Sequence, residues 1–512
     1  MQPGSGTCTT TDPPNLYFTM INGLTMKYLT KSPRWILAVL TAGLFSCEES
    51  KQETPRQDLR ENTLVTILRD EHYTPEEFVD ALGAPTMTAM FEEIAPELLP
   101  WAKGLLKLKV NSHLPALDRS FLNEVGTGPG GTRKWEIQSY TFSYCSQTVD
   151  GRDVVMSGRV TFPNNTVEGV SHSVKTLSLH THQMLLDADC APSENLMYMP
   201  LKALWDSAVI EPDYQQWGIN FAQIPDGGGS PKVMVRQLAD CVLAALEVMR
   251  KHDVTLAPDG YTTNWGSSQN SMVPIAFAHY YETEAPAWFQ DEVKLRSTFT
   301  GEGPYDLPYM LFDSTSEEFS SNKLFWIWYL PSFSEKQLGG YSPYDFFNPW
   351  FKDTKIEYNG REYTALEACS MGLSSKLDQD ALNSRFTPGT VVAADMLTPE
   401  GEIDENSPKA RALKACLLRH NNLPGWQPMR PIYIAHCKED PMLLYKYAER
   451  YARLLSENGN NPNVRLLEVP STDIDAEGLD PHLLISFLFQ INMACVKEPE
   501  DLMTVYRPVS LK

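Results

Sequence analysis

The sequence predicts an α/β fold in which a mostly parallel sheet carries helices on both faces. Short apolar runs typical of strands alternate with helix-like runs from about residue 135 onward, and this alternation is typical of parallel strands joined by crossover helices. The chain has 512 residues, of which 42% are hydrophobic. It can therefore form one large domain with an insertion, or two to three smaller ones, and its composition argues against a disordered chain.

The first strands are predicted to form an antiparallel hairpin at one edge of the sheet. Alternating residues over 135–144 and a returning run over 154–162 flank Asp150-Gly151, which is a hairpin turn signal. Shorter apolar runs then predict further strands over 174–179, 208–210, 261–265, 293–300, 431–435 and 464–469.

Helices are predicted between these strands. Residues 232–251 carry apolar positions three to four apart, which is the spacing of a helix with one buried face. Further helices are expected from residue 272, over 442–455 and over 482–494.

Residues 301–428 interrupt this alternation and are predicted to be an inserted helical lid. The segment is rich in Pro and Gly, and it is strongly aromatic between residues 325 and 351. The aromatic side chains either frame an acyl pocket or form the core of a cap. The sheet is thus predicted to come from two parts of the chain, 126–300 and 429–512.

The N-terminus has the features of a targeting segment. Basic residues precede the apolar run WILAVLTAGLF at positions 35–45, whose eleven residues suit a signal peptide and are too few to span a bilayer. The run leads into Leu44-Phe45-Ser46-Cys47, which resembles the lipobox of bacterial lipoproteins. We therefore expect residues 1–47 to be a signal peptide with Cys47 as the lipidation site. An ordinary cleaved signal peptide, an uncleaved anchor, and a true start at Met26 remain alternatives.

The segment after Cys47 predicts how the protein is displayed. Residues 48–60 are expected to be a polar linker, and the acidic residues that open it resemble the surface-export signal of some Gram-negative lipoproteins. This resemblance implies an outer-membrane lipoprotein at the cell surface, whose membrane contact is its N-terminal lipid. Residues 61–125 are predicted to be a helical extension, with a helix beginning at Thr74-Pro75-Glu76-Glu77.

Composition also excludes several classes of partner and cofactor. The formal net charge of −22 argues against nucleic acid, whose phosphates require a basic surface. The chain has 9 cysteines, and those beyond Cys8 and Cys47 show no CxxC spacing and lie mostly in apolar runs, so we expect no disulfide framework and no structural zinc. The glycine-rich stretch 126–131 lacks a following Gly-Lys-Ser/Thr and is not a phosphate-binding loop.

The most informative motif is Gly266-Ser267-Ser268-Gln269-Asn270, between a predicted strand and a predicted helix. A serine at such a sharp turn exposes its hydroxyl above the sheet. The motif nearly matches G-x-S-x-G, with Asn270 in place of the last glycine. Ser268 as a plain turn serine and Ser267 as the nucleophile are alternatives, although the second places Trp265 at the first glycine position. We expect Asn270 to preserve the turn and shift the pocket; a catalytically inactive descendant is the alternative.

A nucleophilic serine requires a base and an orienting acid, and both follow in the chain. The strand predicted over 431–435 leads through His436-Cys437-Lys438-Glu439 to Asp440, and His482 is the one histidine beyond Asp440. Asp440 could instead cap the next helix, and His482 could cap the last one. The acid could also come from one of three later aspartates, namely Asp473, Asp475 and Asp480.

In this order and setting the chain resembles the α/β-hydrolase fold family, in a secreted esterase- or lipase-like form with an inserted lid. The resemblance covers about residues 135–496, and its matching residues are the hairpin 149–158, the turn Glu211-Pro212-Asp213-Tyr214, Gly266-Ser267-Ser268-Gln269, Asp440 and His482. It implies Ser268 as nucleophile, His482 as general base and then acid, and Asp440 as the orienting carboxylate.

The resemblance also implies an oxyanion hole. One donor would be the backbone N–H of Gln269, and the second would come from the loop 179–182, with Thr181 first and His180 next. A metal site on His180-Thr181-His182 would require an aspartate and a histidine where the chain has Met184 and Leu185, so no metal is expected.

The implied activity is hydrolysis of a carboxylic ester, in a small or acylated substrate, through an acyl-enzyme and without a cofactor. Three alternatives remain. A lipase would share the site and differ in its lid and pocket. A serine peptidase of related fold would cleave amides, but no propeller domain is found. A surface lipoprotein could use the fold only as a binding scaffold.

Overall fold

The computed structural model divides the chain into two units, Met1–Asp58 and Leu59–Lys512, and all the described residues lie in the second unit. The predicted signal peptide, Cys47, the linker, most of the helical extension, the stretch 126–131 and the later aspartates lie outside the described residues. The structure describes residues 63–74, 77–78, 81, 135–148, 151–165, 170–181, 193, 199–214, 218–220, 231–312, 330, 333–349, 355–358, 360–364, 367, 392–469, 482, 486, 489–490, 492–494, 503 and 506–511.

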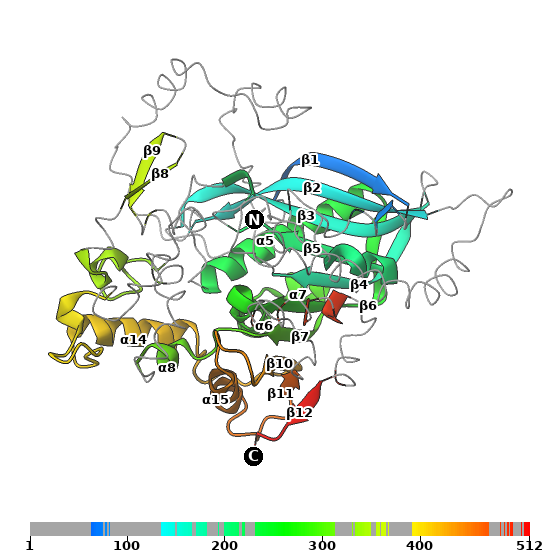
Figure 1. Ribbon diagram of the computed structural model, residues 1–512. Coiled ribbons are helices and arrows are strands. Elements are labelled where there is room, and N and C mark those ends of the chain that lie inside the picture. The colour runs from blue at the N-terminus through cyan, green and yellow to red at the C-terminus, as the bar shows by residue number, and fades with distance from the viewer. Residues whose placement is uncertain are drawn as a thin grey trace, which may run out of the picture. The chain divides into compact units, whose positions relative to one another are not determined.

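A 10-stranded mixed sheet forms the centre of the second unit, in the order β1-β2-β3-β5-β4-β6-β7-β10-β11-β12 (Figure 1). The run from β5 to β11 is parallel, which confirms the mostly parallel sheet. The strands are β1 Leu64–Tyr73, β2 Trp135–Gln147, β3 Asp153–Asn165, β4 His172–His180, β5 Ser207–Pro212, β6 Val254–Ser267, β7 Leu295–Gly301, β10 Ile432–Cys437, β11 Val464–Val469 and β12 Arg507–Val509.

The predicted hairpin is present, but it is not the edge of the sheet. β2 and β3 pair antiparallel, and the turn between them places Gly151 at φ 81°, a conformation that glycine adopts without strain. β1 pairs antiparallel with the outer side of β2, so the prediction of a helical extension over 61–125 is wrong for residues 64–73. The β-branched run from Val65 to Ile67 favours a strand, and pairing with β2 satisfies its backbone.

The helix start at Thr74 is confirmed by a reciprocal pair of hydrogen bonds. The Thr74 N–H donates to the Glu77 carboxylate at 2.8 Å, and the Glu77 N–H donates to Thr74 Oγ1 at 3.2 Å. This is the capping-box arrangement that ends β1 and begins a helical turn.

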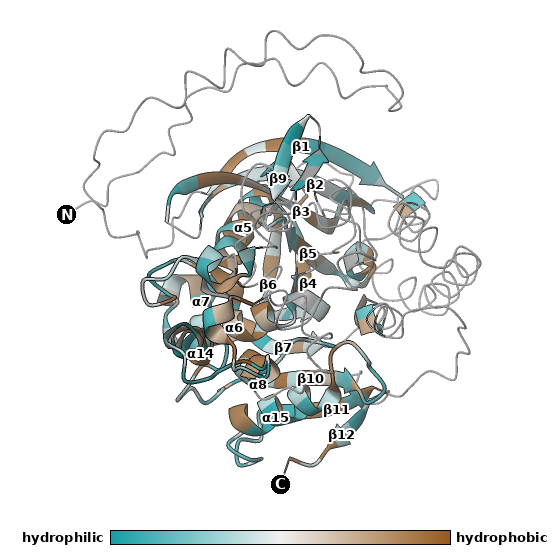
Figure 2. Ribbon diagram, turned by 60° about the vertical axis from the view of Figure 1, so that its left-hand side comes forward, coloured by the Kyte–Doolittle hydropathy of each residue, from teal (hydrophilic) through white to brown (hydrophobic). Residues whose placement is uncertain are grey.

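Helices pack on both faces of the sheet. On β10, Ile432 and Ile434 belong to the main apolar core, whereas Tyr433 and Ala435 are buried outside it; because successive strand residues point to opposite faces, both faces are covered. α6 is almost wholly apolar and buried, while α15 combines apolar and charged residues (Figure 2). The main helices are α5 Pro231–Lys251, α6 Met272–Thr283, α7 Ala287–Val293, α8 Leu307–Phe312, α14 Pro408–His420 and α15 Tyr445–Leu455.

Short 3₁₀ turns connect several of these elements. They are η3 Met199–Trp205, η4 Gly218–Asn220, η5 Ser268–Asn270, η8 Pro343–Phe346 and η10 Ala394–Met396. η5 is the turn that carries the predicted nucleophile.

The inserted segment has a second apolar core of its own, built on α8, α14 and the turns η8 and η10. Phe333, Phe346 and Phe347 from the aromatic run are buried in this core, together with Tyr447 of α15. Of the two predicted roles for the aromatic side chains, these residues therefore have the second, which is to form a core within the inserted segment. The segment also contains a hairpin of β8 Lys355–Tyr358 and β9 Arg361–Thr364. The aromatic residues at 325–329 and 350–351 lie outside the described residues.

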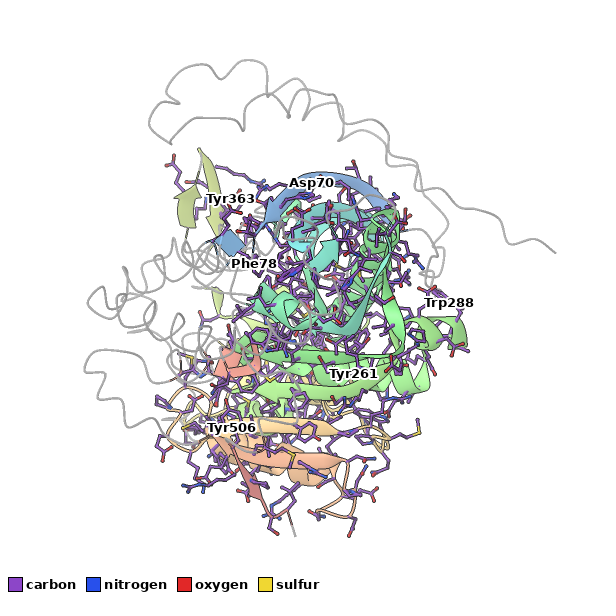
Figure 3. The ribbon with its side chains drawn as sticks, turned by 90° about the vertical axis from the view of Figure 1, so that its right-hand side faces the viewer. Asp70, Phe78, Tyr261, Trp288, Tyr363 and Tyr506 are labelled. Carbon is purple, nitrogen blue, oxygen red and sulfur yellow. The ribbon has the colours of Figure 1, made fainter. Side chains whose placement is uncertain are left out.

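Asp70 on β1 and Tyr506 beside β12 mark the two edges of the sheet (Figure 3). Cys145 is disulfide-bonded, which the expectation of no disulfide framework did not include, because the periodicity of β2 indicates burial and no partner. Cys241, Cys416 and Cys437 are free and buried, as expected.

In the part of the chain that the structure describes, no helix has the length and apolar character of a membrane span.

Candidate active site

Ser268 lies at a sharp turn between β6 and α6. Its φ is 51°, which is a left-handed conformation that costs a non-glycine residue of the order of 1 kcal/mol. Ser267 before it is extended, with φ −138° and ψ 166°. The turn therefore reverses the chain within one residue and lifts the Ser268 side chain off the end of the strand.

Close packing explains the glycine that precedes the turn. A Cβ on Gly266 would lie 2.2 Å from Thr181 Oγ1 and 3.0 Å from the Asn270 carbonyl oxygen. Asn270 itself is only 1% exposed, and its carbonyl accepts a hydrogen bond from Thr181 Oγ1 at 3.3 Å. The turn is therefore present with Asn270 at the last glycine position, and the Asn270 side chain is buried there.

The structure brings Ser268, His482 and Asp440 into one chain of hydrogen bonds. Ser268 Oγ lies 2.9 Å from His482 Nε2, and His482 Nδ1 lies 2.7 Å from Asp440 Oδ2. A carboxylate can only accept, so the Nδ1 proton faces Asp440 and the Nε2 lone pair faces the serine hydroxyl. Three residues from distant parts of the sequence thus have the connectivity that activates a serine.

Asp440 is held by more than the histidine. Its second oxygen, Oδ1, accepts hydrogen bonds from the N–H groups of Met442 and Leu443, each at 2.9 Å. Burial acts to raise the pKa of Asp440, but the hydrogen bonds that it accepts from His482 and from the backbone outweigh burial, so the pKa lies below its ordinary value. Asp440 therefore caps the turn that leads to α15 and orients His482 at the same time; the two interpretations of this residue are compatible.

Ser267, the alternative nucleophile, is differently placed. It is 3% exposed, and its hydroxyl oxygen accepts a hydrogen bond from Gln490 Nε2 at 2.8 Å. This contact supports the turn through Gln490, whereas the short contact to His482 Nε2 is made by Ser268.

The expected oxyanion donors are only partly compatible with the structure. The Thr181 N–H donates to the Trp265 carbonyl at 3.0 Å, so the prediction that it is free to bind an oxyanion is wrong: it continues the ladder between β4 and β6. His180 is the last residue of β4, paired with Trp265, and its buried ring lies 3.2 Å from Glu211, so its place is in the sheet as well. His182 lies outside the described residues.

Gln269 retains its predicted position. It follows Ser268 in η5, at the start of a helical turn, where the first N–H groups have no intrahelical acceptor. The backbone of Gln269 is thus suited to donate toward charge that develops next to Ser268 Oγ.

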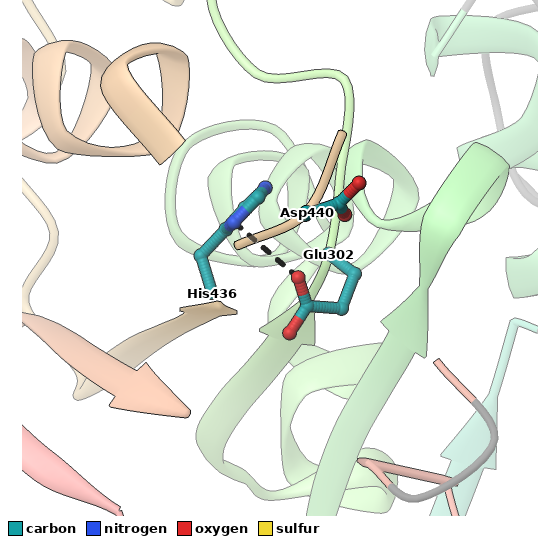
Figure 4. A group of neighbouring side chains, drawn as sticks. All are labelled: Glu302, His436 and Asp440. Carbon is teal, nitrogen blue, oxygen red and sulfur yellow. Dashed lines mark ion pairs between the residues drawn. The ribbon is translucent and has the colours of Figure 1, made fainter. Parts of the chain in front are cut away.

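Two site residues were missed from the sequence. Glu302 and His436 are fully buried, and one ligand-type atom from each lies within 4.8 Å of the other and of an Asp440 oxygen (Figure 4). The signal was available for Glu302, because it follows a predicted strand just as Asp440 does. Burial lowers the pKa of His436 to about 4, so its ring is neutral.

These three residues form the one candidate cation site among the described residues, but their atoms have other partners. Asp440 binds His482 and two backbone amides. Both oxygens of Glu302 accept from the Cys437 N–H at 3.1 Å, and His436 Nδ1 lies 2.9 Å from the Cys437 carbonyl. The group is therefore a hydrogen-bonded network behind the Ser268–His482–Asp440 chain.

The strand order and the serine turn after β6 give the protein an α/β-hydrolase-like fold. An inferred hydrolase from Legionella pneumophila has a similar structure, with a TM-score of 0.54 and 14% identity over 85% of this chain and 97% of its own. The rice cell wall degrading esterase LipA from Xanthomonas oryzae is also similar, with a TM-score of 0.51 and 16% identity over 84% of this chain and 97% of its own. Neither a protein-family model nor a curated protein matches the sequence.

Proposed function

We propose that this protein is a serine-dependent hydrolase of carboxylic esters. The observation that carries the proposal is the hydrogen-bonded chain from Ser268 Oγ through His482 to Asp440, at 2.9 and 2.7 Å. The fold it shares with an esterase and an inferred hydrolase supports the proposal, although the fold alone does not specify an activity.

In the proposed mechanism, Ser268 Oγ attacks the ester carbonyl while His482 Nε2 takes the hydroxyl proton. Asp440, with its lowered pKa, keeps the Nδ1 proton in place and stabilises the imidazolium that forms. The Gln269 N–H stabilises the negative oxygen, a contribution of about 3 kcal/mol for one such donor. His482 then returns the proton to the leaving alcohol, and the acyl group stays on Ser268.

The second half of the reaction reverses these roles. Water enters, His482 takes its proton, and the resulting hydroxide attacks the acyl carbon. Collapse of the second intermediate releases the acid and returns the proton to Ser268 Oγ. The protein supplies every proton transfer through side chains of the described site, so the proposal includes no cofactor and no metal.

The test is a Ser268→Ala variant assayed on short-chain nitrophenyl esters. We expect kcat to fall by a factor of about 10⁴ to 10⁶, and reaction with a fluorophosphonate probe to disappear. Ser267→Ala is the matched control: this hydroxyl bonds to Gln490, and its loss should change kcat by less than about tenfold. Unchanged turnover in Ser268→Ala, or no labelling of the folded wild-type protein, would refute the proposal and favour the binding-scaffold alternative.

Acyl-chain preference separates an esterase from a lipase. Phe333, Phe346 and Phe347 of the inserted segment pack in its own core, which favours short or medium acyl groups over a long acyl tunnel lined by these residues. A rising kcat/KM from butyrate to palmitate esters would favour the lipase alternative, and cleavage of an amide analogue would favour the peptidase.

We also propose that the protein is an outer-membrane lipoprotein anchored through Cys47 and displayed at the cell surface. The support is the apolar run that leads into Leu44-Phe45-Ser46-Cys47 and the acidic segment after it. Metabolic labelling with an alkyne fatty acid should mark the wild-type protein and not Cys47→Ser, which should leave the membrane fraction. Equal labelling of both would refute the anchor, and resistance to protease added to intact cells would refute surface display.

A further inference from the structure

Glu302 is held at a crowded and strained position at the end of β7. Its φ is 47°, and it is fully buried. A Cβ on Gly301 would lie 2.7 Å from the Phe489 ring, and one on Gly303 would lie 1.7 Å from Ser271 Oγ. A non-glycine residue in this conformation, between two glycines that cannot carry a side chain, indicates a role for its carboxyl group.

Strand β10 holds Glu302 by both its backbone and its side chain. The Glu302 N–H donates to the Ala435 carbonyl at 3.0 Å. The Cys437 N–H donates to both carboxyl oxygens at 3.1 Å. Asp440 lies three residues after Cys437, so the segment that positions the Glu302 carboxyl also leads directly to the carboxylate of the proposed triad.

The Glu302 carboxyl faces Asp440 with no cation to compensate a second charge. Its titratable neighbours in the described part of the chain are Asp440, His436 and Cys437 on the β10 side, Tyr305 after β7, and Tyr506 before β12; none is Lys or Arg. A Glu302 oxygen and an Asp440 oxygen lie within 4.8 Å of each other, and burial and the charge of Asp440 raise the pKa of Glu302 well above its ordinary value. Two adjacent buried carboxyls do not both ionise.

The number of donors decides which of the two keeps its proton. Asp440 accepts from His482 and from two backbone amides. Glu302 accepts from one amide, and His436 Nδ1 lies 3.3 Å from it but closer, at 2.9 Å, to the Cys437 carbonyl. Hydrogen bonds to the charged form favour ionisation. The negative charge therefore belongs on Asp440 and the proton on Glu302.

We propose that Glu302 is a positioning residue for the Ser268–His482–Asp440 site, where as a neutral carboxylic acid it donates a hydrogen bond to Asp440 and fixes that carboxylate against His482. This inference rests on the proposed function. Asp440 is then oriented from two sides, by amides at the start of the α15 turn and by Glu302 at the end of the neighbouring strand. Loss of its proton places a second negative charge beside Asp440 and disturbs this geometry.

The first experiment compares Glu302→Gln and Glu302→Leu on a short-chain nitrophenyl ester. Glutamine keeps the shape and a donor, and kcat at pH 7 should stay within about threefold of wild type. Leucine keeps similar bulk without a donor, and kcat should fall about 10- to 100-fold, as for other groups that orient a site residue through a hydrogen bond. KM should change little, because Glu302 lies behind the site.

The pH profile distinguishes positioning from a purely structural role. A raised pKa means that Glu302 is neutral below that value and ionised above it, so kcat of the wild type should decline at alkaline pH. Glu302→Gln cannot ionise, and its alkaline decline should disappear. A wild-type profile that is flat at alkaline pH, or the same decline in Glu302→Gln, overturns the inference.

A double-mutant cycle tests whether the effect passes through Asp440. In an Asp440→Asn background, Glu302→Leu should cost no further kcat, because no carboxylate remains to be held. An equal loss in both backgrounds, or a lowered Tm with unchanged kcat and pH profile, overturns the inference in favour of a structural role. Loss of activity with a chelator, restored by a divalent cation, overturns it in favour of a metal site.

The two proposals fail in different ways. A folded wild-type protein that neither labels with fluorophosphonate nor hydrolyses esters refutes the proposed function, and the role of Glu302 with it. A labelled, active wild type in which Glu302→Leu keeps full kcat refutes only the present inference.

Discussion

Two buried histidine–carboxylate pairs lie at the carboxyl ends of strands in this sheet, and they differ in charge. His482 Nδ1 lies 2.7 Å from Asp440, and His180 Nδ1 lies 3.2 Å from Glu211. The pKa of Asp440 is lowered, whereas burial raises the pKa of Glu211 to about 8 and lowers that of His180. The first pair has an ionised carboxylate at neutral pH, and the second is a neutral hydrogen-bonded pair.

The difference comes from the other donors to each carboxylate. Asp440 accepts two backbone N–H groups in addition to His482. Glu211 has the charge of Arg159 in its favour, but its second oxygen has no hydrogen-bond partner in the part of the chain that the structure describes. Burial then dominates. A histidine beside a carboxylate is therefore insufficient for an orienting acid; backbone donors to that acid are also required.

The largest expected effect is on turnover, and it should separate the two pairs completely. Asp440→Asn should lower kcat by about 10⁴, because the asparagine side chain can hold His482 in the wrong tautomer. Glu211→Gln, the matched change in the second pair, should lower kcat by less than about tenfold. Similar losses of kcat in the two variants would mean that the difference in pKa between Asp440 and Glu211 does not identify the orienting carboxylate. Steady-state kinetics on one ester substrate measures both.

An intermediate effect is expected from removing a single backbone donor to Asp440. Replacement of Met442 by its α-hydroxy acid removes the N–H that lies 2.9 Å from Asp440 Oδ1. Loss of one hydrogen bond to a charged group costs about 1.5 kcal/mol, so kcat should fall about tenfold. The same backbone change at Tyr447, whose N–H donates to the Leu444 carbonyl, is the control and should leave kcat unchanged. An unchanged kcat at Met442 would show that the amides do not set the state of Asp440.

The smallest effect concerns stability and its pH dependence. The pKa of Glu211 is raised to about 8 in the folded protein. Its contribution to the free energy of unfolding is therefore fully present below its unfolded pKa of about 4.3. That contribution is lost as pH rises toward 8, since the unfolded state ionises first. The free energy of unfolding should therefore fall from pH 5 to pH 8 more steeply in the wild type than in Glu211→Gln.

Urea unfolding of both proteins at the two pH values measures this difference, and other titrating groups cancel because they are common to both. Parallel pH dependence would show that Glu211 is ionised in the folded protein, which would remove the contrast with Asp440.

The helices and strands that carry periodic patterns could be predicted from the sequence, as could the three residues of the proposed triad. β6, α6, β10 and β11 have apolar runs with clear boundaries, and the order Ser268, Asp440, His482 follows from position alone. The strand β1 was missed because its apolar positions are irregular, with bulges in its pairing to β2. The disulfide at Cys145 was missed because a cysteine in an apolar strand has the same pattern whether it is paired or free.

The sequence did not predict correctly which backbone N–H groups could bind an oxyanion. Thr181 follows a strand, as the fold family requires, but its N–H donates a hydrogen bond to the Trp265 carbonyl. Only the register between β4 and β6 reveals this bond. Glu302 also follows a predicted strand, but only the tertiary structure reveals that it is buried near Asp440.

Local pattern in the chain was thus enough to specify the α/β architecture and the order of its chemical groups, because periodicity and turn chemistry act over a few residues. The tertiary structure decided which carboxylate is ionised, which amide is free and which acid stands behind Asp440. These properties depend on burial and on donors that come from strands far apart in sequence. Their energies arise only when β7 and β10 lie side by side and water is excluded between them.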